Sequence, residues 1–80
     1  MSAVTVYSKP ACVQCDRTKR KLTQLGATFT EVDVTEDPGA YAYVTGLGYS
    51  SAPVVVVNNG GEDIHFAGYR PDLISEHVEA

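Results

Sequence analysis

The sequence predicts a small α/β domain in which strands and helices alternate before a closing hairpin and helix. Residues 4–7 alternate apolar and polar side chains, whereas residues 15–25 repeat apolar residues at steps of three and four. The Asn-Asn-Gly-Gly run at 58–61 is the strongest turn signal and lies between two further strand patterns. The predicted order is β-α-β-α-β-β-α, and 80 residues predict one domain over residues 1–80.

The first strand leads into a helix that begins beside the first cysteine. Residues 4–7 are rich in β-branched side chains, and Pro10 favours a sharp entry into the helix just ahead of Cys12. The inward stripe of this helix is predicted to comprise Cys15, Thr18, Leu22 and Leu25. Gly26 supplies the stop. Because Cys12 lies ahead of the stripe, we expect Cys12 to hold the exposed sulfur and Cys15 the shielded one.

Two elements follow the first helix. Residues 27–34 mix β-branched and aromatic side chains with acids, which predicts a strand with one solvated face or at a sheet edge. A second helix is predicted to begin at Pro38, with Asp37 or Thr35 as its cap, and to end at the glycine at 46 or 48. Its inward stripe is predicted to comprise Ala40, Val44 and Leu47.

The last part of the chain predicts a hairpin and a short helix. Four consecutive valines at 54–57 indicate a strand buried on both faces. After the turn at 58–61, the alternating residues 64–67 complete the hairpin. Residues 68–72, Gly-Tyr-Arg-Pro-Asp, then open a last helix. The apolar side chains of this helix are Leu73, Ile74 and Val78.

The charge and hydropathy patterns limit the classes of partner. The net charge is −4, and no segment approaches the roughly 20 apolar residues that a membrane span needs. Nucleic-acid binding rests on clustered positive charge, which this acidic chain has only at Arg17, Lys19, Arg20 and Lys21. That run is either a solvated helix face or a surface that steers an acidic partner. Residues 1–7 do not form a signal peptide, so we expect a soluble, cytoplasmic protein that binds neither nucleic acid nor membrane. A monomer is expected because no exposed apolar surface is evident.

Cys12-Val13-Gln14-Cys15 contains both cysteines, and we interpret it as a redox site. A crosslink that closes so small a loop stabilises a fold little, because the entropy removed from the unfolded chain grows with loop length. In a reducing cytosol such a pair is more often a cycling redox pair than a static bridge. A helix N-terminus stabilises a thiolate, so Cys12 is the predicted attacking sulfur and Cys15 the resolving one. Lys9 either adds positive potential or is an ordinary solvated lysine.

The sequence leaves other interpretations of the cysteine pair open. A structural zinc site needs about four ligands, and only His65 and His77 remain as the usual nitrogen donors, without zinc-finger spacing. An iron-sulfur cluster commonly needs four thiolates, so two cysteines per chain would require a dimer or an outside thiol. A catalytically inert interaction domain is a further alternative. Pro53 begins the third strand, and the sequence alone does not indicate a cis peptide bond there.

Three motifs together are typical of one family. The Cys-Val-Gln-Cys motif follows the first strand and precedes Thr18-Lys19, Ala52-Pro53 precedes the third strand, and residues 68–72 open the last helix. With these motifs the whole chain resembles the NrdH-redoxins, which are glutaredoxin-like proteins with thioredoxin-like activity. The resemblance implies a thioredoxin fold, with a four-stranded mixed sheet of order 4-3-1-2, strand three antiparallel, and three helices on its two faces.

The resemblance also implies roles and partners. It makes Cys12 the nucleophile, Cys15 the resolving thiol and Pro53 a cis-proline that presents the backbone of Ala52 to a substrate chain. It implies electrons from NADPH through thioredoxin reductase, not from glutathione, and transfer to the large subunit of class Ib ribonucleotide reductase. No tightly bound cofactor and no metal are implied. The residues expected at the partner-binding surface are Lys9, Val13, Gln14, Ala52, Pro53 and Arg70.

The chain departs from the family pattern at one loop. The family usually has Trp-Ser-Gly-Phe-Arg-Pro where this chain has Phe-Ala-Gly-Tyr-Arg-Pro at residues 66–71. Phe66 has no indole N–H and Ala67 no hydroxyl, so hydrogen bonds made by those groups in the family are absent here. The alternative function is a glutathione-dependent glutaredoxin, a group that usually places glycines and an acidic residue at the last helix. Pro71 removes a backbone donor there, whereas Asp72 leaves that alternative open.

Overall fold

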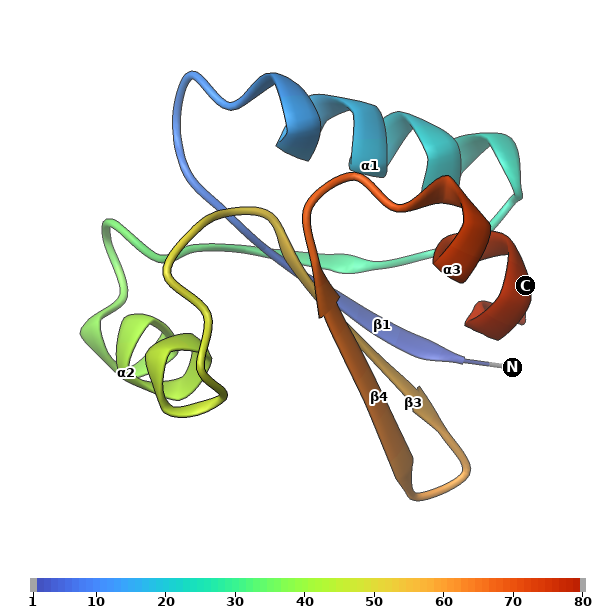
Figure 1. The fold of residues 1–80 in the computed structure, drawn as a ribbon. Coiled ribbons are helices and arrows are strands. Elements are labelled where there is room, and N and C mark those ends of the chain that lie inside the picture. The colour runs from blue at the N-terminus through green and yellow to red at the C-terminus, as the bar shows by residue number, and fades with distance from the viewer. Residues whose placement is uncertain (1, 80) are drawn as a thin grey trace.

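Four strands and three helices make up the computed structural model, which describes residues 2–79 (Figure 1). In chain order the elements are β1 (Ala3–Ser8), α1 (Val13–Gln24), β2 (Thr30–Asp33), α2 (Pro38–Gly46), β3 (Val54–Asn59), β4 (Glu62–Ala67) and α3 (Pro71–His77). This confirms the order β-α-β-α-β-β-α that the sequence predicts.

The strands form one mixed sheet in the order β2-β1-β3-β4. β1 is parallel to β2 and antiparallel to β3, and β3 is antiparallel to β4. β3 therefore runs against the other strands, and the predicted thioredoxin topology is confirmed. β2 is an edge strand as expected, but it begins at Thr30, opposite Thr5, and not at residue 27. The predicted strand is too long because Ala27 and Phe29 pack against the core instead of pairing with β1.

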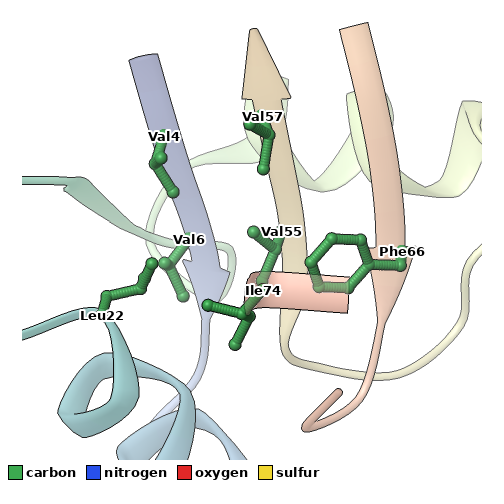
Figure 2. Packing of buried hydrophobic residues seen from close by; sticks show 7 residues of the cluster. All are labelled: Val4, Val6, Leu22, Val55, Val57, Phe66 and Ile74. Atoms are coloured by element: carbon green, nitrogen blue, oxygen red, sulfur yellow. The ribbon is translucent and has the colours of Figure 1, made fainter. Parts of the chain in front are cut away.

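The sheet buries a different set of side chains on each face. α1 and α3 lie over one face and α2 over the other (Figure 1). Under α1 and α3, Figure 2 shows a cluster that consists of Val4, Val6, Leu22, Val55, Val57, Phe66 and Ile74. The smaller cluster under α2 consists of Val44, Val54 and Val56. The four valines of β3 thus alternate between the clusters and are all buried, which confirms the prediction for this strand.

α1 ends one residue before its predicted inward stripe does. The buried residues of α1 are Cys15, Thr18 and Leu22, as expected. Leu25 was predicted to complete this stripe, but it retains 36% of its surface. Leu25 is the C-cap residue, and the chain turns away directly after it at Gly26, whose φ is +76°. The prediction for Leu25 is wrong because the helical spacing no longer applies at the cap.

α2 begins as predicted but packs more loosely. Asp37 is the N-cap, and its Oδ1 accepts a hydrogen bond of 3.0 Å from the backbone N–H of Ala40, while Pro38 occupies the first turn. Val44 is the only buried residue of α2. Ala40 and Leu47 are half-buried, so the predicted inward stripe is too wide. This helix therefore packs on the sheet through one buried side chain and a few partly buried ones.

The hairpin between β3 and β4 turns at Gly60 and Gly61. Their φ values are +66° and +98°, which a two-residue turn between antiparallel strands requires and which favours glycine. Asn59 and Glu62 pair directly across the turn. The predicted turn is confirmed, and both strands extend further toward it than the sequence indicated.

A polar contact joins β1 and β2 to the middle of α1. Glu31 Oε2 accepts hydrogen bonds of 2.8 Å from Lys19 Nζ and of 2.8 Å from Ser8 Oγ. The bond from Lys19, and secondarily that from Ser8, lowers the pKa of Glu31 from its usual value of 4.5. A lowered pKa means that this contact stabilises the fold above pH 4.5 and that the contribution is lost as the pH falls further.

Glu31→Gln is therefore expected to destabilise the protein at neutral pH and to have a smaller effect in acid. Both side chains of the ion pair are partly exposed, 29% for Lys19 and 42% for Glu31, so solvent screening limits the difference to less than about 1 kcal/mol. Urea unfolding of both proteins at pH 7 and at about pH 3 measures it. A stability difference of the same size at both pH values would contradict the assignment to this carboxylate.

Candidate redox site

Cys12 and Cys15 lie at the N-terminus of α1 and are joined by a disulfide. Cys12 is the N-cap residue, with φ −119° and ψ 103°, and the Cα atoms of the two cysteines are 5.2 Å apart. The turn before it is made by Ala11, whose φ of +56° lies in the left-handed region that residues with a Cβ rarely adopt. The predicted sharp entry ahead of Cys12 is confirmed.

The two cysteines differ less in exposure than the sequence predicts. Cys12 retains 9% of its surface and Cys15 retains 1%, so Cys12 is the more accessible of the two. The expectation of an exposed Cys12 is nevertheless wrong for this disulfide form, because the Cys12 side chain folds back over the first turn of the helix. There Cys12 Sγ accepts a hydrogen bond of 3.1 Å from the backbone N–H of Cys15.

This arrangement favours a thiolate on Cys12 once the pair is reduced. The N–H groups in the first turn of a helix have no partner within the helix, and their dipoles stabilise negative charge. A hydrogen bond to the charged form of a thiol lowers its pKa. Cys15 lies one turn further along, on the buried side of α1. The pair can therefore act as an attacking thiolate and a shielded resolving thiol.

Two hydrogen bonds connect the loop before α3 to the cysteine motif and to the segment before β3. The carbonyl of Pro53 accepts from the N–H of Gly68 at 2.8 Å, and Gln14 Oε1 accepts from the N–H of Tyr69 at 3.0 Å. Gly68 has a φ of +83°, and a Cβ there would lie 3.3 Å from Gln14 Oε1, so both backbone and space favour glycine. The Ala52-Pro53 bond is cis, as the resemblance implies. Three segments thus meet at one site.

Gln14→Ala is expected to loosen the loop before α3. The substitution removes the acceptor of the Tyr69 N–H, a hydrogen bond that contributes about 1 kcal/mol, so this amide should exchange with deuterium about fivefold faster. Hydrogen exchange followed by NMR measures the rate at Tyr69. Gln24→Ala, at the other end of α1, is the matched control and should leave the rate unchanged. Equal rates at Tyr69 in the Gln14 variant and the parent would contradict this role.

A cleft of about 280 Å³ lies between α2 and the sheet. Lys9 and Ala52, both predicted to contact a partner, line it together. Its aromatic lining consists of Tyr7, Tyr41 and Tyr49. Tyr7 is half-buried here, and this burial raises its pKa above the usual 10.0. The cleft is thus mainly apolar, with one cationic side chain in its lining.

Several large apolar side chains contact solvent. Val13 retains 66% of its surface, and Tyr41 and Tyr43 on α2 retain 57% and 41%. The expectation that no exposed apolar surface exists is therefore wrong. It fails because Val44 is the only buried residue of α2, which leaves the tyrosines of this helix largely uncovered. A monomer was expected because no exposed apolar surface was evident in the sequence, and the monomeric state stays a prediction.

Arg70 occupies the N-cap position of α3 and pairs with Asp72. Its Nε donates to Asp72 Oδ1 at 3.2 Å and its Nη2 donates to Oδ2 at 3.0 Å. These hydrogen bonds lower the pKa of Asp72 and raise that of Arg70. The acidic group at the start of the last helix is thus engaged by the chain's own arginine.

The histidines lie in other surroundings. His65 Nδ1 is 2.8 Å from the Tyr49 hydroxyl, and His77 Nε2 is 3.0 Å from Glu76 Oε2. Within residues 2–79, no three His, Cys, Asp or Glu side chains form a group that could hold a metal ion. Nor is any helix in that range long and apolar enough to cross a membrane.

Sequence reasoning missed two parts of the site. The bond between Gln14 and Tyr69 spans 55 positions, and no local pattern reveals such a contact. The apolar cleft could have been found, because α2 contains no charged residue although most of its surface faces solvent. A helix without charges on its outer side indicates an uncovered apolar surface.

Known proteins resemble this chain along nearly its whole length. The family model for glutaredoxin matches residues 4–61. A gene 56 protein of Mycobacterium phage L5 is 46% identical over 79 residues, which cover 95% of this chain and 72% of that protein. The glutaredoxin-like protein NrdH of Lactococcus lactis subsp. cremoris (strain MG1363) is 34% identical over 73 residues, 91% of this chain and 96% of that protein.

A solved structure agrees with these relatives. The NrdH-redoxin of Escherichia coli, described as a glutaredoxin-like protein with a thioredoxin-like activity profile, superimposes with a TM-score of 0.86. The sequences are 31% identical, and the match covers 98% of this chain and 97% of that one. The similarity therefore includes the fold as well as the sequence.

Proposed function

Because this chain belongs to the glutaredoxin family and, within it, to the NrdH-redoxins, we propose that it carries electrons from thioredoxin reductase to class Ib ribonucleotide reductase. It is a thiol-disulfide oxidoreductase whose active pair is Cys12 and Cys15. In this proposal NADPH supplies the electrons, no cofactor is tightly bound, and the protein works in the cytoplasm. The acceptor is a disulfide on the large subunit of the reductase.

The reaction follows from the two cysteines. The Cys12 thiolate bonds to one sulfur of the substrate disulfide, whose S–S bond breaks, and the other sulfur leaves as a thiolate that takes a proton from water. The Cys15 thiolate then attacks Cys12 Sγ and breaks the mixed disulfide. The substrate leaves with both sulfurs reduced, and the chain holds the Cys12–Cys15 disulfide seen in the structure. Two electrons from thioredoxin reductase restore the dithiol.

The Arg70–Asp72 pair is the observation that favours thioredoxin reductase over glutathione as the electron donor. A glutaredoxin site uses an acidic residue at the last helix to hold glutathione, but Asp72 here accepts two hydrogen bonds from Arg70. Pro71 also lacks the N–H that a glutathione carboxylate could use. The thioredoxin-like activity profile of the Escherichia coli relative supports the same donor.

NADPH oxidation during insulin disulfide reduction tests the donor. Thioredoxin reductase is compared with glutathione plus glutathione reductase, each with the same amount of this protein. The proposal predicts turnover with thioredoxin reductase and rates with glutathione that are at least about tenfold lower. Turnover with glutathione alone would assign the chain to the glutathione-dependent glutaredoxins.

A further inference from the structure

The charges of this acidic protein are distributed unevenly. The net charge is −4, yet four of its six lysines and arginines lie on the twelve-residue helix α1, which contains only one acid. These four cations are Arg17, Lys19, Arg20 and Lys21. The helix that begins at the reactive cysteines is therefore a basic segment on an otherwise acidic molecule.

Three of these cations have no ion-pair partner among the residues that the structure describes. Lys19 Nζ is 2.8 Å from Glu31 Oε2 and 3.6 Å from Asp16 Oδ1, so Lys19 forms ion pairs within the chain. Arg17, Arg20 and Lys21 form no ion pair with any residue of the range 2–79. Arg17 and Arg20 are exposed. Their charge is available to another molecule.

The helix dipole explains only part of this distribution of cations along α1. A cation near a helix C-terminus is stabilised by the dipole, and Lys21 lies in the last turn of α1. Arg17 is the fifth residue of the helix, where the dipole gives a cation no such stabilisation. The helix dipole therefore does not account for Arg17, which is the arginine closest to the redox site.

The arginines share one side of α1 with an exposed apolar residue. Val13, Arg17, Arg20 and Gln24 follow steps of four, three and four, so they form a row opposite the buried residues Cys15 and Leu22. We call this row, with Lys21 at its edge, the outer strip. Val13 directly follows Cys12 and retains 66% of its surface. At 1.5 Å per residue, Arg17 and Arg20 lie about 6 and 10 Å further along the helix.

The surface beside the loop that precedes Cys12 has an excess of acidic side chains. A hollow beside Pro10 and Ala11 has more acids than bases in its lining. The acids are Asp16, Glu31, Asp33 and Glu36, and the bases are Lys9 and Lys19. An acidic partner segment is repelled from that side and attracted to the outer strip. The two surfaces together select one orientation of a partner whose disulfide approaches Cys12.

We infer that the outer strip of α1 binds an acidic segment that adjoins the disulfide of a substrate protein. The inference rests on the proposed function, because it specifies which protein disulfides the site takes. The substrate has an apolar residue next to its disulfide, against Val13, followed by acidic side chains that reach Arg17, Arg20 and Lys21. Such a contact raises the association rate at low salt, and the gain disappears as salt screens the charges.

Single-turnover reduction of synthetic disulfide peptides tests the inference. The reduced protein is mixed with peptides that differ only in four residues after the disulfide, all Glu, all Gln or all Lys, and the rate constant is read from a fluorophore–quencher pair across the disulfide. At about 20 mM salt we expect the Glu peptide to react about tenfold faster than the Gln peptide, and the Lys peptide more slowly. At about 0.5 M salt the difference should fall below about twofold.

Two variants separate the effect of the outer strip on the peptide preference from the effect of the protein's net charge. The triple variant Arg17→Gln, Arg20→Gln, Lys21→Gln should lower the ratio of Glu-peptide to Gln-peptide rates to about one. The matched control Thr28→Glu, Ala42→Glu, Ser75→Glu lowers the net charge by the same three units at exposed positions outside α1 and should keep most of the preference.

The outcomes distinguish this inference from the proposed function. Equal rates for the three peptides, or an equal loss of preference in both triple variants, would overturn the assignment to the outer strip while leaving the redox function intact. Failure of the parent protein to reduce the Gln peptide would contradict the redox function itself and the inference with it. A single-stranded oligonucleotide that competes at lower concentration than a cysteine-free Glu peptide would assign the strip to nucleic acid instead.

Discussion

Cys12→Ser is expected to reduce disulfide reductase turnover more than about a thousandfold. Cys12 is the more accessible cysteine and its Sγ is the atom reached by the Cys15 N–H, so we propose that its thiolate is the nucleophile that forms the first bond to the substrate. A serine hydroxyl is not ionised at neutral pH and cannot form that bond. NADPH oxidation with thioredoxin reductase and insulin measures the loss, and circular dichroism checks that the variant is folded.

Cys15→Ser is the matched variant and should behave differently. It retains the nucleophile but cannot resolve the mixed disulfide, so a covalent adduct between Cys12 and a substrate cysteine should accumulate. Non-reducing electrophoresis and mass spectrometry detect the adduct. An adduct that forms through Cys15 in the Cys12→Ser protein, and none in the Cys15→Ser protein, would reverse the order of the two thiols.

Leu22→Ala is expected to destabilise the protein by about 3 kcal/mol, more than half of the stability of a small domain. Leu22 is 0% exposed and joins α1 to Val6 and Ile74 in the cluster of Figure 2. Truncating a buried leucine costs about 2–5 kcal/mol, and small domains lie near the lower end of the usual stability range of about 5–15 kcal/mol. Urea unfolding at 25 °C measures the difference.

Leu25→Ala is the control on the same helix. Leu25 retains 36% of its surface, so the same truncation should cost less than about 1 kcal/mol. Similar losses for the two variants would mean that Leu25 is buried, as the helical spacing predicts, and that the end of α1 differs from the structure. A loss below about 1 kcal/mol for Leu22→Ala would contradict its place in the core.

The order of elements could be read from the sequence because each element carries a local signal. The four valines of β3, the Gly60-Gly61 turn and the Asp37-Pro38 start of α2 all gave correct predictions. Each rests on interactions between neighbours in the chain. The strand order came from the resemblance to a family and not from these patterns.

The parts that the sequence did not reveal depend on contacts between distant segments or on the detailed geometry of helix ends. The start of β2 depends on where β1 pairs with it, and Phe29 packs on the core instead of extending the strand. The burial of Cys12 depends on the local fold of the first helical turn, and the Arg70–Asp72 pair on how α3 is capped. The Gln14–Tyr69 bond joins the start of α1 to the loop before α3, two segments that only the assembled fold brings together.

Deoxyribonucleotide formation is the measurement that tests the central claim most directly. A class Ib ribonucleotide reductase is supplied with NADPH, thioredoxin reductase and a catalytic amount of this protein as the only electron carrier. We predict sustained product formation with one NADPH oxidised per deoxyribonucleotide, and none with Cys12→Ser. Product that forms only when thioredoxin is added, or only when glutathione and its reductase replace thioredoxin reductase, would contradict the proposed place of this protein between the two enzymes.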